Sequence, residues 1–202
     1  MYQNFKIKKK RFVNILSIDI DYAYSPTISV YEDYVEGSKI SLLEQMKIFK
    51  ENNLPTPEVN QSKIELLKSV IREKTSIDTP VVIAEHHHQI LPFLPKDEPF
   101  SIFNFDHHHD VYYEGWHSID ELDEGNWVYF LQDSPIIKYT WFRNKDSENF
   151  PKGMSLKFET EEVYDFNLDN LPSFDLVFGC SSCHWTGNLG RKNLFKVLGA
   201  KT

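Results

Sequence analysis

The chain has 202 residues, enough for one domain with a complete core and too few for two large domains. Hydrophobic residues make up 41% of it and aromatic residues 14%, which is typical of a globular protein, and no apolar run approaches the length of a membrane span. A net charge of −8 argues against general binding of nucleic acid and favours a cationic substrate. We therefore expect neither a nucleic-acid partner nor a membrane partner.

The beginning of the sequence does not have the pattern of a signal peptide. A basic segment, residues 6–11, precedes an apolar run, but Asp19 and Asp21 cut that run short. The chain holds two cysteines, Cys180 and Cys183, so no disulfide scaffold is indicated. These features favour a cytoplasmic location.

The first half of the chain predicts two strands and two helices. Residues 14–18 are mostly apolar and predict a first buried strand. Apolar residues at helical spacing predict helices over residues 38–52 and 61–74. The continuous apolar run of residues 81–84 is typical of a central parallel strand, and residues 90–94 are expected to follow as a short helix or apolar loop.

The second half continues the alternation of strands and helices. Apolar and aromatic residues at alternate positions predict a buried strand over residues 101–105. The later predicted elements are a helix over residues 128–131, strands over residues 136–142, 154–158 and 174–179, and a closing helix over residues 189–198. This pattern predicts an α/β fold, with a single three-layer domain over residues 1–202 and a mostly parallel sheet.

Five polar residues, 106–110, follow the strand predicted for residues 101–105. Because successive side chains of an extended chain alternate between faces, Asp106, His108 and Asp110 are expected on one side and His107 and His109 on the other. Two oxygen donors beside a nitrogen donor suit a divalent metal such as Mn or Zn. A polar strand end with a histidine-rich turn is the alternative interpretation.

Two other predicted strands end in residues of the same kind. Asp19 and Asp21 leave the first strand, where buried carboxylates need a cation or a hydrogen-bond network. The strand over residues 81–84 ends in Glu-His-His-His, at the edge where open α/β sheets bind ligands. The candidate ligands are then Asp19, Asp21, a histidine among residues 86–88, Asp106, His108 and Asp110. Six such donors fit two metal ions bridged by carboxylates, which indicates metal-assisted hydrolysis.

Residues 180–184 match the haem-attachment pattern C-x-x-C-H. Haem attachment belongs to exported proteins, and the match ends a predicted buried strand, whereas a redox C-x-x-C usually opens a helix. We therefore favour packing cysteines beside a site, or a weak thiol site, over haem.

The polar clusters resemble the motifs of the arginase–deacetylase fold, which carries D-x-H-x-D, S-x-D-x-D and an earlier strand that ends in G-G-D-H-S. Residues 106–110 match the first motif, residues 17–21 the second and residues 84–88 the third, loosely. Gly125-Asn126-Trp127 is similar to the G-N segment that follows in arginases. The nearest resemblance is to small arginase-like proteins that include peptide arginases, which turn arginine into ornithine within a ribosomal peptide.

The resemblance implies a cofactor, a reaction and a partner. The cofactor is a pair of Mn²⁺ ions, the reaction releases urea from a peptidyl arginine, and the partner is an arginine-containing precursor peptide. By position, the implied bridging ligands are Asp19 and Asp106, with His87 and Asp110 completing the shell of one ion and His108 and Asp21 that of the other. In arginases S-x-D-x-D follows D-x-H-x-D, whereas here it comes first, so an arginase-like fold would have to be circularly permuted.

Two catalytic roles of arginases have no direct counterpart here. The proton-shuttling histidine that follows G-N-L falls on Val128, so His88 or His117 is the expected substitute. The guanidinium-binding glutamate is expected, by order in the chain alone, among Glu32, Glu36 and Glu44, of which we select Glu44.

The main rival is a Mn-dependent phosphoesterase of the D-H-H type, in which D-x-D near the N-terminus precedes D-H-H without any permutation. That assignment leaves residues 85–88 and 125–127 unexplained, and the sequence has no glycine-rich or basic phosphate cradle. A metal-binding module without catalysis is a third interpretation, which two bridging aspartates disfavour.

Overall fold

The computed structural model describes residues 12–24, 58–112 and 120–199, together with residues 47, 50, 51 and 53. Its centre is a sheet of six strands in the order β2-β6-β1-β3-β4-β5, and every neighbouring pair is parallel. The strands are β1 (Val13–Asp19), β2 (Val81–Ala84), β3 (Phe100–Phe105), β4 (Ile136–Phe142), β5 (Glu159–Val163) and β6 (Leu176–Cys180). The prediction of an α/β fold with a parallel sheet is confirmed.

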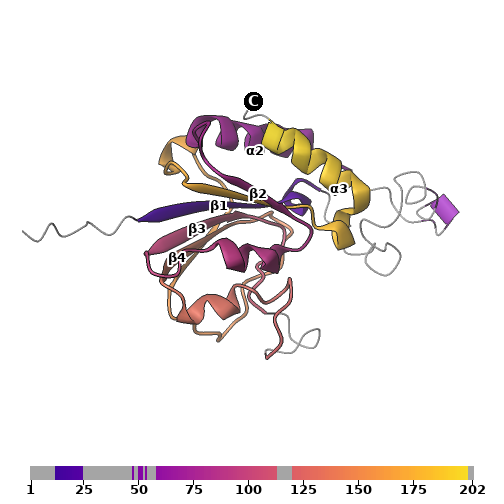
Figure 1. The fold of residues 1–202 in the computed structure, drawn as a ribbon. Coiled ribbons are helices and arrows are strands. Elements are labelled where there is room, and N and C mark those ends of the chain that lie inside the picture. Colours follow the sequence, from indigo (N-terminus) through magenta and orange to yellow (C-terminus); the bar gives the residue numbers. More distant parts are fainter. Residues whose placement is uncertain are drawn as a thin grey trace, which may run out of the picture.

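Helices cover both faces of this sheet (Figure 1). The long helices α2 (Gln61–Lys74) and α3 (Cys183–Leu198) lie together on one face. The short helices η4 (His87–Phe93) and η5 (Tyr129–Asp133) lie on the other, while η1 (Ile20–Ala23) continues directly from β1, and η6 (Leu168–Asn170) precedes β6. Each face has its own hydrophobic core, so the sheet is held from both sides.

Helix α2 begins and ends where the sequence predicts. The Asn60 side chain accepts a hydrogen bond from the backbone N–H of Lys63, which satisfies one of the unpaired donors of the first turn. Its predicted apolar stripe is buried against the sheet: Ile64, Leu67, Val70 and Ile71. The closing helix α3 begins six residues earlier than predicted, at Cys183.

Two strand predictions are wrong in detail. Residues 154–158 form no strand; the fifth strand is β5, which begins at Glu159. The apolar residues of the predicted segment instead pack from an irregular stretch onto the core, while Lys138 of β4 holds the acidic β5 through Glu159 and Glu161, each 2.9 Å away. Strand β2 is an edge strand of the described sheet and not a central one. The helix predicted over residues 38–52 lies mostly outside the described residues.

The topology brings the ends of β1 and β3 side by side. These strands are neighbours, and Ile18 pairs in register with Phe105. The residues that follow, Asp19 and Asp106, therefore leave the sheet at the same level. Strand β2 ends at the same edge, separated from β1 by β6. In the described part of the chain, no helix is both long and apolar enough to cross a membrane.

Candidate metal centre

All six predicted ligands lie at the carboxyl edge of the sheet, and they converge. Two groups of side chains have candidate ligand atoms that all lie within 4.8 Å of one another: Asp19, His87 and Asp106 in the first, and Asp21, Asp106 and His108 in the second. Asp106 belongs to both groups. The residues are buried, apart from His108, which keeps a 15% exposed side chain.

The first group is centred on the imidazole of His87. Its Nδ1 lies 2.9 Å from Oδ2 of Asp106 and 3.6 Å from Oδ2 of Asp19. Asp110 joins this group, because its Oδ2 lies 2.8 Å from the same nitrogen. Three carboxylates therefore face one imidazole nitrogen.

The second group is centred on His108. Its Nδ1 lies 2.8 Å from Oδ2 of Asp21 and 3.9 Å from Oδ1 of Asp106. The two carboxylate oxygens of Asp106 thus face different groups, Oδ2 toward His87 and Oδ1 toward His108. This is the arrangement expected of a carboxylate that is shared by two cations.

Two buried atoms of these groups lack a hydrogen bond. Nδ1 of His87 and Oδ2 of Asp21 are shielded from solvent, yet neither makes a hydrogen bond of acceptable geometry despite its close neighbours. Buried polar atoms nearly always make a hydrogen bond, so these two atoms, which point at other polar side chains, need an explanation. Converging carboxylate oxygens and imidazole nitrogens are ligand atoms that suit divalent cations such as Mn²⁺ or Zn²⁺.

Neighbouring residues fix the orientation of several ligands. Ser17 Oγ lies 2.7 Å from Nε2 of His87, which leaves Nδ1 as the ring nitrogen that faces the carboxylates. Asn104 donates from Nδ2 to Oδ2 of Asp106 at 3.1 Å and also to the hydroxyl of Tyr139 at 2.8 Å. Supporting hydrogen bonds of this kind hold metal ligands in their binding rotamers and are worth a large share of the affinity.

Asp110 is held from two directions by the segment that begins at Gly125. Trp127 donates from its indole Nε1 to Oδ2 of Asp110 at 2.7 Å, and the backbone N–H of Val128 donates to the Asp110 carbonyl at 3.0 Å. The Trp127 ring also lies 4.8 Å from that of His87, between centroids. Asp110 itself has a φ of 54°, a left-handed conformation that Asp tolerates better than most residues. The turn and the tryptophan together direct this carboxylate inward.

We expect Trp127→Phe to weaken divalent-metal binding by about 10–100-fold, because the variant keeps a ring against His87 but loses the N–H that orients Asp110. The measurement is a competitive Mn²⁺ titration with a fluorescent chelator. Trp141→Phe is the matched control, since Trp141 is equally buried but donates to the backbone carbonyl of Asp106 and not to a side-chain ligand. Equal affinities for both variants would contradict this role of Trp127.

The pKa shifts of the candidate ligands show how their charges are balanced when no cation is bound. Burial and the repulsion of neighbouring carboxylates raise the pKa of Asp19 and of Asp106 well above the ordinary value. Burial opposes the charge of His108, but the Asp21 carboxylate outweighs it and raises the His108 pKa to about 9. Burial likewise opposes ionisation of Asp21, and His108 outweighs it and lowers the Asp21 pKa to about 2. Protons on ligands thus balance negative charge that a divalent ion would balance when bound.

The other two histidines of the 106–110 segment face away from the centre, as predicted. His107 lies 3.1 Å from Asn144, between its Nδ1 and the amide nitrogen, while its backbone N–H donates to Oδ1 of Asp21. The His109 ring packs against Trp141 and Phe150, and burial lowers its pKa to about 4. The alternation is not that of a strand, because β3 ends at Phe105 and the segment is irregular.

Of the predicted catalytic residues, His88 is the one that lies among the described residues. The structure does not bring His88 into the cluster: its side chain lines a groove beside β2. His117, Glu32, Glu36 and Glu44 lie outside the described residues. Cys180 is a buried free thiol whose pKa burial raises well above the ordinary value, with Sγ donating to the carbonyl of Glu85. In the metal-free chain it is a neutral thiol beside the site, and it belongs to neither group of converging ligand atoms.

Sequence reasoning missed the supporting roles of Ser17, Asn104 and Trp127. Ser17 and Trp127 belong to the motifs, and period-two alternation puts Ser17 on the same face as Asp19 and Asp21, which is the signal that could have found it.

No protein-family model, curated protein or solved structure was found to match this chain, so the function proposed below depends on the geometry and on the resemblance of the motifs.

Proposed function

We propose that the chain is a dinuclear, manganese-dependent hydrolase that converts peptidyl arginine to ornithine with release of urea. The observation that carries the proposal is the position of Asp106, whose two carboxylate oxygens face separate groups of buried donors. Asp19, His87 and Asp110 would hold one ion, and Asp21 and His108 the other, with Asp106 between them.

The residues around the centre suit a charged guanidinium substrate. When bound, a pair of divalent ions supplies a nucleophile from water near neutral pH. The net charge of the chain, −8, favours a substrate that stays cationic at every accessible pH. The four buried carboxylates of the centre would themselves be balanced by two divalent ions. His108 is the candidate ligand with a partly exposed side chain, at 15%, so solvent reaches the centre beside it. Ser17 and Trp127 would keep His87 and Asp110 in place during turnover.

The position of His87, which follows β2, favours this proposal over the phosphoesterase. The D-H-H assignment leaves residues 85–88 without a role, whereas His87 lies within 3 Å of both Asp106 and Asp110. The arginase resemblance selects His87 among the three consecutive histidines. Gly125–Trp127 is likewise unexplained by the rival and contacts Asp110 through Trp127.

The test is to incubate the Mn²⁺-loaded protein with arginine-containing peptides and to measure urea release and peptide mass. The expected result is loss of the mass of one CN2H2 unit per modified arginine, together with one urea. Free arginine and bis(p-nitrophenyl) phosphate are the comparison substrates. Urea from free arginine but not from peptides would make the protein an ordinary arginase, and hydrolysis of the phosphodiester alone would establish the rival.

One observation favours the phosphoesterase. Lys63 of α2 is partly buried, hydrogen-bonds to Asn144 and lies over the Tyr22 ring, 4.9 Å from its centroid. Burial lowers the Lys63 pKa, while the charges of Asp146 and Asp21 act to raise it, so this cation is close enough to the centre to interact with a ligand carboxylate. A lysine there would suit an anionic substrate. The phosphodiester control decides between the two functions.

A further inference from the structure

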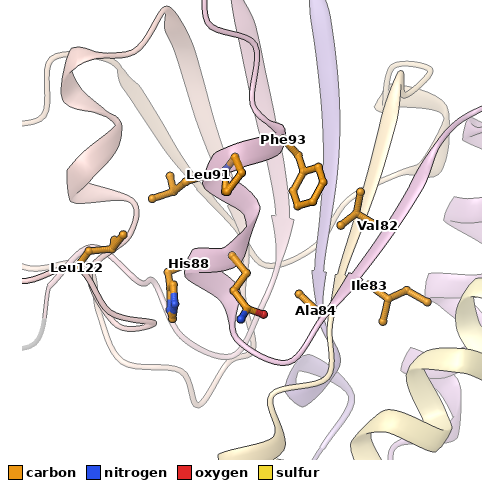
Figure 2. A pocket seen from close by; sticks show the side chains of 9 residues that line it. Val82, Ile83, Ala84, His88, Leu91, Phe93 and Leu122 are labelled. Carbon is orange, nitrogen blue, oxygen red and sulfur yellow. The ribbon is translucent and has the colours of Figure 1, made fainter.

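A groove of about 710 Å³ lies beside β2, at the edge of the described sheet. Figure 2 shows side chains of β2, of η4 and of the loop before Gly125 around it. Its apolar lining includes Val82, Ile83, Ala84, Leu91, Phe93 and Leu122. Three of these side chains are large and substantially exposed: Ile83 at 43%, Phe93 at 50% and Leu122 at 42%. An apolar surface that stays exposed on a folded chain commonly marks a binding site.

Strand β2 is the edge strand of the described sheet, and its residues Val82, Ile83 and Ala84 line the groove. Strand β2 pairs only with β6 in the described sheet, and the carbonyls of Pro80 and Ala84 accept hydrogen bonds on that side. In a parallel strand the N–H and C=O of one residue point the same way and alternate along the chain. The backbone groups of Val81 and Ile83 therefore point outward, where an extended chain could pair with them.

Polar groups line one side of this apolar groove. His88 lies in the groove wall, and its buried Nδ1 has no hydrogen-bond partner. Leu122 is flanked by acidic residues on both sides: Asp120, Glu121, Asp123 and Glu124. Glu124 also lies 2.7 Å from Nδ1 of His86, which places it close to the histidine segment. We call this loop, residues 120–124, the acidic rim: its negative charge suits a basic ligand, and within it Glu124 is paired with His86.

We propose that this groove binds the segment of the substrate peptide that adjoins the target arginine. The segment pairs as an added strand with β2, places apolar side chains against Leu91 and Phe93, and directs basic side chains at the acidic rim. Free arginine has neither a run of main-chain groups nor apolar neighbours, so the groove selects peptides. This inference rests on the proposed function.

The position of the groove relative to the centre supports this occupant. His88 lines the groove, and His87, the residue before it, reaches the carboxylates of Asp106 and Asp110. Consecutive residues of η4 therefore contribute to the groove wall and to the candidate metal centre. Charge complementarity between an arginine-bearing peptide and the acidic rim favours a peptide over a second copy of this acidic chain.

The test uses Ile83→Lys, with Ile137→Lys as its matched control. Both isoleucines lie on strands and are similarly exposed, at 43% and 47%, but Ile137 is on β4 and does not line the groove. A lysine on an open edge opposes strand pairing, and here it also repels a basic peptide. Leu122→Lys is a second variant, on a loop, in case the first disturbs β2.

The probe is a fluorescein-labelled peptide with one arginine between isoleucines, measured by anisotropy with metal-free and Mn²⁺-loaded protein. We expect Ile83→Lys and Leu122→Lys to raise its Kd by about tenfold or more, with Ile137→Lys unchanged. In the urea assay, KM for this peptide should rise to match, while turnover of N-acetylarginine amide stays the same.

Each contrary result has a defined meaning. Failure of the peptide to bind, or wild-type affinity in both groove variants, overturns the groove assignment even if urea is released. Peptide binding that the groove variants weaken, without any urea release, upholds the groove and refutes the hydrolase. A dimer in sedimentation velocity that Ile83→Lys dissociates and the peptide does not would identify a second copy as the occupant and overturn the proposal.

Discussion

Replacing Asp106 by asparagine is expected to abolish activity and to remove tight binding of both ions. Asp106 is the ligand that both donor groups share, so its loss removes one carboxylate oxygen from each. Asparagine keeps the shape of the side chain, and its single amide oxygen can accept from Asn104 or from the His108 N–H, but not from both. Metal content after Mn²⁺ loading and dialysis is the measurement, with urea release from the peptide as the second readout.

Cys180→Ser is the control for this experiment. Cys180 is buried beside Asp19, and its thiol interacts with backbone groups of Glu85 and Ser182 that a hydroxyl can also reach. We expect this variant to keep its metal content and most of its activity, and Asp19→Ala to lose both. A folded Cys180→Ser variant without activity, or one tightly held zinc ion that depends on Cys180, would show that the ligand assignment is wrong.

The positions of the strand ends could be predicted from the sequence because hydrophobic patterning sets them. Residues 14–18, 81–84 and 101–105 are apolar runs that stop at polar residues, and all three are strands of the structure. A parallel sheet aligns their carboxyl ends, so the convergence of Asp19, His87 and Asp106 follows from fold class and strand boundaries. Selecting His87 among three consecutive histidines needed the resemblance, since spacing alone left residues 86–88 equivalent.

The lateral order of strands could not be read in this way. A short apolar run predicts burial, but it does not say whether another strand lies on each side, and β2 proved to be at the edge. Met154, Leu156 and Phe158 alternate as in a strand, yet they pack on the core from an irregular segment, and the strand that pairs with β4 is the acidic β5. Contacts far apart in sequence decide both cases, and local pattern does not contain them.

Adding Mn²⁺ to the metal-free protein is expected to raise its melting temperature, and the rise should grow with pH. One ion at a hundred times its Kd contributes about 2.7 kcal/mol. For a protein of this size that is roughly 5–10 °C, and a second ion adds to it. In the metal-free state, protons on Asp19, Asp106 and His108 balance the charge of the cluster, and the bound ions replace them.

The sign of the pH dependence follows from the pKa of His108, which Asp21 raises from its ordinary value of 6.5 to about 9. The proton on His108 stabilises the metal-free fold fully below pH 6.5, and that contribution is lost as the pH rises through about 9. Over the same range the proton competes less with the ion. The two are the same exchange of the His108 proton for the ion. This exchange enlarges the Mn²⁺-induced shift, which scanning fluorimetry between about pH 6 and pH 9 would measure. An unchanged shift across this range, or an equal shift in the Asp106→Asn variant, would show that the bound ion does not occupy this cluster.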